Sequence, residues 1–65
     1  MIINGENHVL TEPATLVDVL RGAGYDLSRP LAVEQNGHIV PRTRFEDTLV
    51  RPDDRLEVVH FVGGG

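Results

Sequence analysis

The sequence lacks several residue types on which the chemistry of small proteins often depends. It has 65 residues and no cysteine, which excludes disulfide bonds and thiolate zinc sites. All six basic residues are arginine, which excludes a Schiff base, a lysine general base and a lysine acceptor for an isopeptide bond. The three histidines, His8, His38 and His60, are scattered, and this spacing predicts no metal site.

Long apolar runs, aromatic residues and excess positive charge are equally scarce. No stretch approaches the ~20 apolar residues of a membrane span. The first five residues lack the basic region and apolar stretch of a signal peptide. With 5% aromatic residues and a net charge of −4, the chain is poorly suited to stacking on bases or contacting phosphates. We therefore expect a cytoplasmic protein that binds neither nucleic acid nor membranes.

The residues that are present suffice for one small domain with two hairpins. The apolar fraction is 40%, and a chain of this size buries only about 60% of its unfolded surface. Asn4-Gly5 and Asn36-Gly37 predict tight type I′ turns, because both central positions of that turn need a positive φ. The strands that these turns join are expected at 1–3 with 7–10 and at 31–35 with 38–40.

A short helix is predicted between the hairpins, over 16–23. Leu16, Val19, Leu20 and Ala23 follow the i, i+3, i+4, i+7 spacing of one buried face. Thr15 is the expected N-cap, because its hydroxyl can accept from the Asp18 N–H, and Gly24 suits the left-handed position after the last turn.

The second half of the chain is less regular until its end. Phe45 is expected to anchor the polar loop 42–48, and Leu49 and Val50 to form a brief strand or pack below the sheet. The longest apolar run, 56–62, suits a central strand that is covered on both faces or continues into a partner. We expect this strand to pair in parallel with the first, with the hairpin partners as edges and the helix on one face. That is a two-layer α+β architecture.

Few side chains in the sequence indicate chemistry. No catalytic constellation is predicted: Ser28 has no evident histidine partner, and Asp53-Asp54 is expected in a solvated turn. His60 is interpreted as a partly exposed strand residue or, alternatively, a proton shuttle, and Arg42 as a surface charge or an anion ligand. The last three glycines, Gly63, Gly64 and Gly65, have two interpretations. They form a frayed end, or they let a terminal carboxylate thread into the active site of another protein, where side chains would clash.

Taken together, these segments resemble the ThiS family of thiamine sulfur carriers, which are ubiquitin-like β-grasp proteins. The resemblance spans essentially the whole chain. Its motifs are Ile2-Ile3-Asn4-Gly5, Thr15-Leu16-Val17-Asp18-Val19-Leu20, Leu31-Ala32-Val33-Glu34-Gln35-Asn36-Gly37, Ile39-Val40-Pro41-Arg42, and Leu56 through Gly65. It implies a mixed four- or five-stranded sheet on one helix over residues 1–62, with 63–65 as a flexible tail.

The resemblance also implies a function without catalysis by the chain itself. An E1-like, ThiF-like enzyme would use ATP and magnesium to adenylate the carboxylate of Gly65, and sulfur from a cysteine desulfurase would replace AMP. The resulting thiocarboxylate would donate sulfur to a ThiG-like thiazole synthase. Gly64 and Gly63 would thread the tail, while Val62 and Phe61 would help to dock partners or simply pack in the sheet. No cofactor would be bound permanently, and the free carrier would be a monomer.

Three other functions remain open from the sequence. The carrier could serve molybdopterin synthesis, tRNA thiolation or a specialised metabolite, because the fold and tail are shared. It could be a ubiquitin-like modifier joined to lysines of target proteins. It could also be an interaction domain whose tail has no role.

Overall fold

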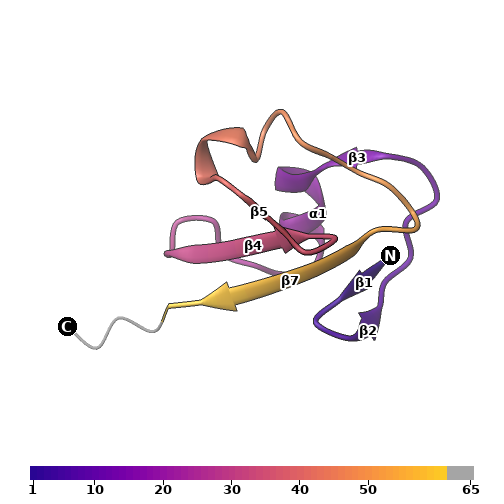
Figure 1. Cartoon of the computed structure of the whole chain (residues 1–65), viewed down its shortest axis with the longest axis horizontal. Helices are drawn as coiled ribbons and strands as arrows, with labels where there is room; N and C mark the ends of the chain where they lie inside the picture. The colour runs from indigo at the N-terminus through magenta and orange to yellow at the C-terminus, as the bar shows by residue number, and fades with distance from the viewer. Residues whose placement is uncertain (62–65) are drawn as a thin grey trace.

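The structure is a computed structural model, and it describes residues 1–61. Figure 1 shows the elements in chain order. They are β1 (Ile2–Ile3), β2 (Glu6–Asn7), β3 (Ala14–Thr15), α1 (Leu16–Gly22), β4 (Leu31–Gln35), β5 (His38–Val40), a 3-10 turn (Arg42–Arg44), β6 (Leu49–Val50) and β7 (Arg55–His60).

Both asparagine-glycine pairs form the predicted turns. The φ angles are +51° and +82° at Asn4 and Gly5, and +50° and +85° at Asn36 and Gly37. These positive values are what a type I′ turn requires. The first hairpin is shorter than expected, because β2 spans only Glu6–Asn7, although the His8 N–H still donates to the Met1 carbonyl at 2.8 Å.

The helix begins and ends close to its predicted bounds. The Asp18 N–H donates to Thr15 Oγ1 at 3.2 Å, so Thr15 is the N-cap. The last helical residue is Gly22, one before the predicted end, and Gly24 then takes a φ of +90°. Leu16, Val19 and Leu20 are buried on one face of α1, as the spacing predicted.

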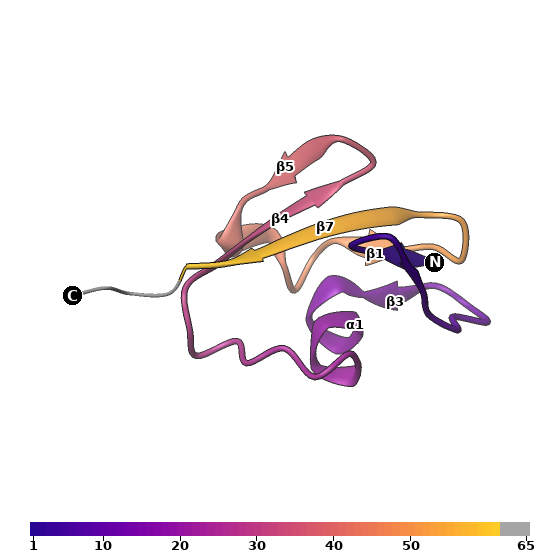
Figure 2. The same cartoon turned by 90° about the horizontal axis from the view of Figure 1, so that it is seen from below.

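The five-stranded sheet of residues 1–61 has the order β2-β1-β7-β4-β5. β7 pairs in parallel with β1, placing Ile2 opposite Arg55, and antiparallel with β4, placing Val33 opposite Val58. The predicted order is therefore confirmed, with β2 and β5 as edges. Figure 2 shows α1 on one side of this sheet.

One prediction about β7 is wrong. Of the two alternatives for this strand, coverage on both faces is contradicted, because only Leu56 and Val58 are buried and Val59 is 55% exposed. The other alternative, continuation into a partner, stays a prediction. The helix covers a single face, so alternate residues of β7 face solvent. The hydrophobic core lies on the helix side and consists of Ile3, Leu16, Val19, Leu20, Leu31, Val33, Phe45, Val50, Leu56 and Val58.

A second, two-stranded sheet joins the helix entry to the segment before β7. β3 pairs antiparallel with β6, so that Ala14 lies opposite Val50 and Thr15 opposite Leu49. The sequence suggested a brief strand at Leu49–Val50 but not its partner at Ala14–Thr15. Phe45, buried as expected, packs in the same core.

Candidate functional site

The candidate site begins where β7 ends. Phe61 follows the last strand residue and is 58% exposed, while its N–H donates to the Pro30 carbonyl at 3.2 Å. In Figure 1 this end of β7 points away from the N-terminus. The predicted tail residues Gly63, Gly64 and Gly65, and the predicted docking residue Val62, lie outside the described residues.

An asparagine side chain binds the backbone of β7 at Val58, shortly before Phe61. Asn4 Oδ1 accepts from the Val58 N–H at 2.7 Å, and Asn4 Nδ2 donates to the Val58 carbonyl at 3.0 Å. The amide thus continues the pairing of β1 with β7 beyond the Ile3–Leu56 pair as far as Val58, as a backbone peptide would. Asn4 Nδ2 also donates to the Tyr25 hydroxyl at 3.3 Å.

Beyond Val58, the strand faces a small polar group. The His60 ring lies 5.1 Å from the Tyr25 ring, with a 45° tilt between them. Next to Tyr25, Asp26 Oδ1 accepts from both the Ser28 hydroxyl at 2.6 Å and the Ser28 N–H at 2.9 Å. These bonds, with a smaller contribution from the Arg29 charge, lower the pKa of Asp26. His60 is exposed, and the proton-shuttle alternative remains a hypothesis.

The pair Asp53-Asp54 is not uniformly solvated, which corrects the sequence prediction. Asp53 is exposed, but Asp54 is only 9% exposed. Its carboxylate accepts from Gln35 Nε2 at 2.9 Å, Asn36 Nδ2 at 3.0 Å and the Arg51 N–H at 2.8 Å. Burial raises the pKa of Asp54, but these hydrogen bonds outweigh it and the net pKa is lowered. The group ties the β4–β5 turn to the turn before β7 and is structural.

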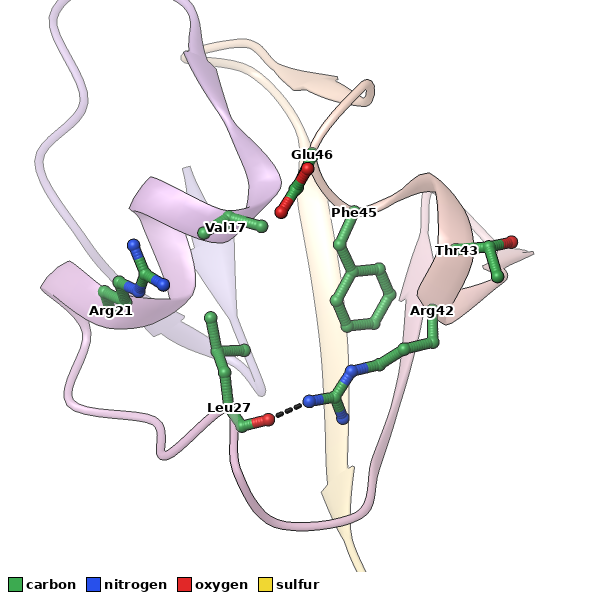
Figure 3. Close-up of a pocket in the computed structure, with 7 residues that line it drawn as sticks. All are labelled: Val17, Arg21, Leu27, Arg42, Thr43, Phe45 and Glu46. Atoms are coloured by element: carbon green, nitrogen blue, oxygen red, sulfur yellow. Dashed lines mark hydrogen bonds between the residues drawn. The ribbon is translucent and has the colours of Figure 1, made fainter.

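Arg42 also has a structural role. Figure 3 shows it beside a pocket of about 510 Å³, where its guanidinium donates to the Leu27 carbonyl. It also donates to the Arg29 carbonyl at 3.2 Å and lies 5.7 Å from the centroid of the Phe45 ring. The guanidinium therefore links the α1–β4 connection to the 3-10 turn through two backbone carbonyls.

Polar side chains gather at two places in residues 1–61, around Asp26 and around Asp54. Residues 1–61 contain no group of three or more His, Asp or Glu side chains that could hold a metal ion. None of the helical structure in that range is long and apolar enough to cross a bilayer. The hydrogen bonds from Asn4 to the Val58 backbone were not predicted from the sequence. The only indication of them was the position of Asn4 in an Asn-Gly turn beside the first strand.

Comparison with known proteins decides the family. The sequence profile of the ThiS family matches residues 1–65. The chain belongs to the ThiS family. A crystal structure of the thiamine biosynthesis protein ThiS from Geobacter metallireducens superposes with a TM-score of 0.82 at 27% identity, covering 98% of this chain and 96% of that one. The ThiS β-grasp fold is thereby confirmed.

A sulfur carrier protein and two thiazole synthases are similar to this chain in sequence. The sulfur carrier protein ThiS of Bacillus subtilis is 36% identical over 55 residues, covering 83% of this chain and 80% of that protein. A thiazole synthase from Paramagnetospirillum magneticum is 40% identical over 65 residues, which are all of this chain and 20% of that protein. Another, from Magnetococcus marinus, is 40% identical over 63 residues. The chain spans about a fifth of the length of these two synthases.

Proposed function

We propose that this ThiS-family chain is a sulfur carrier of thiamine biosynthesis that works through the carboxylate of Gly65. An E1-like enzyme transfers AMP from ATP, with magnesium, to this carboxylate and releases pyrophosphate. Sulfur supplied by a cysteine desulfurase then replaces AMP, leaving a thiocarboxylate. A thiazole synthase takes the sulfur from it. The ATP requirement favours the cytoplasm.

The observation that carries the proposal is the match of the whole chain to a family that includes the Bacillus sulfur carrier. The thiazole synthases that contain a similar segment support the thiazole synthase as the acceptor, rather than an enzyme of another sulfur pathway. The fold adds a physical reason. β7 is the central strand, and hydrogen bonds hold it through Phe61, so the residues that follow start from a fixed point.

A cellular test separates this function from that of an interaction domain with an idle tail. The chain, made to end at Gly65, should restore growth without thiamine to a strain that lacks its own ThiS. Removing Gly65, or adding one bulky residue after it, should abolish growth, because the reactive carboxylate is displaced or blocked. Both variants should unfold at the same urea concentration as the wild type. Growth of either variant would refute the terminal-carboxylate mechanism.

A further inference from the structure

The two Asn-Gly turns bind the backbone of β7 from opposite sides. β1 lies on one side of β7 and β4 on the other. Asn4, which follows β1, bonds the N–H and the carbonyl of Val58. Asn36, which follows β4, bonds both backbone groups of Arg55: its N–H donates to the Arg55 carbonyl at 2.8 Å, and its Oδ1 accepts from the Arg55 N–H at 2.9 Å. Each asparagine side chain therefore continues the hydrogen bonding of the sheet.

The Asn36 amide also bonds a carboxylate. Asn36 Nδ2 donates to Asp54 Oδ1 at 3.0 Å, so both ends of the amide are engaged. The other oxygen of Asp54 accepts from Gln35 Nε2 at 2.9 Å and from the Arg51 N–H at 2.8 Å. Because Asp54 is only 9% exposed, rotation of the Asn36 amide would deprive a nearly buried carboxylate of a donor.

An Asn-Gly pair is also a reactive segment of a polypeptide. Asparagine is thermolabile, and it is most labile before glycine, which has no Cβ to hinder the reaction. The glycine backbone nitrogen attacks the asparagine Cγ, the bond from Cγ to Nδ2 breaks, and ammonia leaves with the proton of the glycine N–H. Water then opens the cyclic imide on either side of its nitrogen, which gives aspartate or isoaspartate. Water is the only co-reactant.

We propose that Asn36 is a latent deamidation site, which the fold protects by holding the Asn36 amide between Asp54 and Arg55. Reaction requires the side chain to turn its Cγ onto the Gly37 nitrogen, and hydrogen bonds at both Oδ1 and Nδ2 oppose this rotation. The site therefore reacts when this end of the sheet opens. The inference is independent of the proposed function, because it concerns the lifetime of the fold.

The product does not fit the position that the amide occupies. Aspartate keeps an oxygen for the Arg55 N–H but loses the donor to Asp54. Two carboxylates then meet where a hydrogen bond of 3.0 Å now joins an amide to a carboxylate, and like charges this close repel. Isoaspartate lengthens the backbone of the turn and shifts the register of β5 against β4. Deamidation of Asn36 therefore makes the opening of this turn irreversible.

Reaction rates in the folded and the unfolded chain test the protection. The chain and the peptide 33–39 are incubated at one neutral pH, without urea and in urea above the unfolding midpoint. Each reaction adds the mass difference between water and ammonia, and tryptic cleavage after Arg21 puts Asn4 and Asn36 in separate peptides. Asn36 should react at least ~tenfold more slowly in the folded chain than in urea, because two side-chain hydrogen bonds must break first. The peptide should react alike in both solutions.

Asp54→Ala and Asp53→Ala are a matched pair that tests the contact itself. D54A removes the acceptor of Asn36 Nδ2, whereas the Asp53 side chain is exposed. In folded D54A, Asn36 should react about tenfold faster than in the wild type, since one of its two restraints is gone. Asn4 should stay within about twofold, because Val58 still holds it. D53A should match the wild type at both asparagines.

The consequence of the reaction is tested with Asn36→Asp. N36D should unfold at a lower urea concentration than the wild type. N36D/D54N exchanges the amide and the carboxylate, so its midpoint should fall by less than the two single shifts added together. An unchanged midpoint for N36D, or additive shifts in the double variant, would refute the clash with Asp54.

Two kinetic results would overturn the protection. If Asn36 reacts as fast in the folded chain as in the peptide, the hydrogen bonds do not restrain the amide. If D54A accelerates Asn4 and Asn36 in parallel, global unfolding controls the reaction and the contact with Asp54 does not.

Discussion

The side chain of Asn4 forms two hydrogen bonds with the backbone of Val58. Its Oδ1 accepts from the Val58 N–H at 2.7 Å, and its Nδ2 donates to the Val58 carbonyl at 3.0 Å. One residue thus makes the first turn and also extends the pairing of β1 with the last strand. Because β7 leads to Phe61, this contact holds the strand shortly before the candidate site.

Replacing Asn4 with glycine tests this contact without straining the turn, because glycine accepts the positive φ. We expect the free energy of unfolding to fall by about 1–2 kcal/mol, since two partly buried backbone groups lose their partners. Urea unfolding measures the loss, and hydrogen exchange at the Val58 amide should become faster. Asn4→Asp, which keeps only the acceptor, should retain part of the protection. Unchanged exchange at Val58 in Asn4→Gly would contradict this role.

Acid should weaken the fold through Asp54. Its folded-state pKa lies below the ordinary value of 3.8, so the stabilisation is complete above that value. It is lost as the pH falls through the lower, folded-state pKa. Asp54→Asn should cost about 1–3 kcal/mol at neutral pH and flatten the decline in stability below about pH 4. Urea unfolding across this pH range measures both effects.

Asp53→Asn is the matched control for Asp54, because the neighbouring carboxylate is exposed. It should leave the unfolding free energy within about 0.5 kcal/mol of the wild type. Equal behaviour of the two variants would show that the hydrogen-bonded group around Asp54 does not stabilise the fold.

Arg42→Lys should destabilise the protein although the charge is kept. The lysine ammonium cannot reproduce the planar guanidinium that bonds the Leu27 and Arg29 carbonyls and lies over Phe45. We expect a loss of about 1 kcal/mol in thermal or urea unfolding. Arg44→Lys is the control, because within residues 1–61 the Arg44 guanidinium makes no hydrogen bond. If both variants behave alike, Arg42 is only a surface charge.

Phe61→Ala tests the predicted docking residue nearest the tail. Because Phe61 is 58% exposed, stability should change by less than about 0.5 kcal/mol. Binding to the adenylating enzyme should weaken by about tenfold, as for an aromatic anchor in an interface. Val9→Ala, at an apolar residue that is 92% exposed elsewhere, should leave binding unchanged. A large loss of stability with unaltered binding would make Phe61 a packing residue.

The local parts of the fold could be predicted from the sequence because their causes are local. Two Asn-Gly pairs determine the hairpins, and Thr15 with the apolar spacing determines the start and buried face of α1. The order of the central strands followed from the longest apolar run. The two-residue pairing of β3 with β6 could not be predicted, because strands this short have no periodicity.

The contacts of Asn4 and Asp54 could not be predicted from the sequence, because their partners are distant along the chain. Asn4 and Val58 are 54 residues apart. The side chains that donate to Asp54, those of Gln35 and Asn36, are 19 and 18 residues from it, so a local window of sequence shows neither contact. The run 56–62 is equally apolar whether one or both faces are covered, and only the structure shows Val59 in solvent. Of the predicted site, Phe61 is placed, while Val62, Gly63, Gly64 and Gly65 lie outside the described residues.

The central claim is that Gly65 carries sulfur as a thiocarboxylate, and intact mass spectrometry tests it most directly. The chain, made to end at Gly65, is incubated with the adenylating enzyme, ATP, magnesium, a cysteine desulfurase and cysteine. We predict a species heavier by the difference between one sulfur and one oxygen atom, and its absence when Gly65 is removed. An unchanged mass, under conditions in which the same enzymes convert Bacillus subtilis ThiS, would contradict the account.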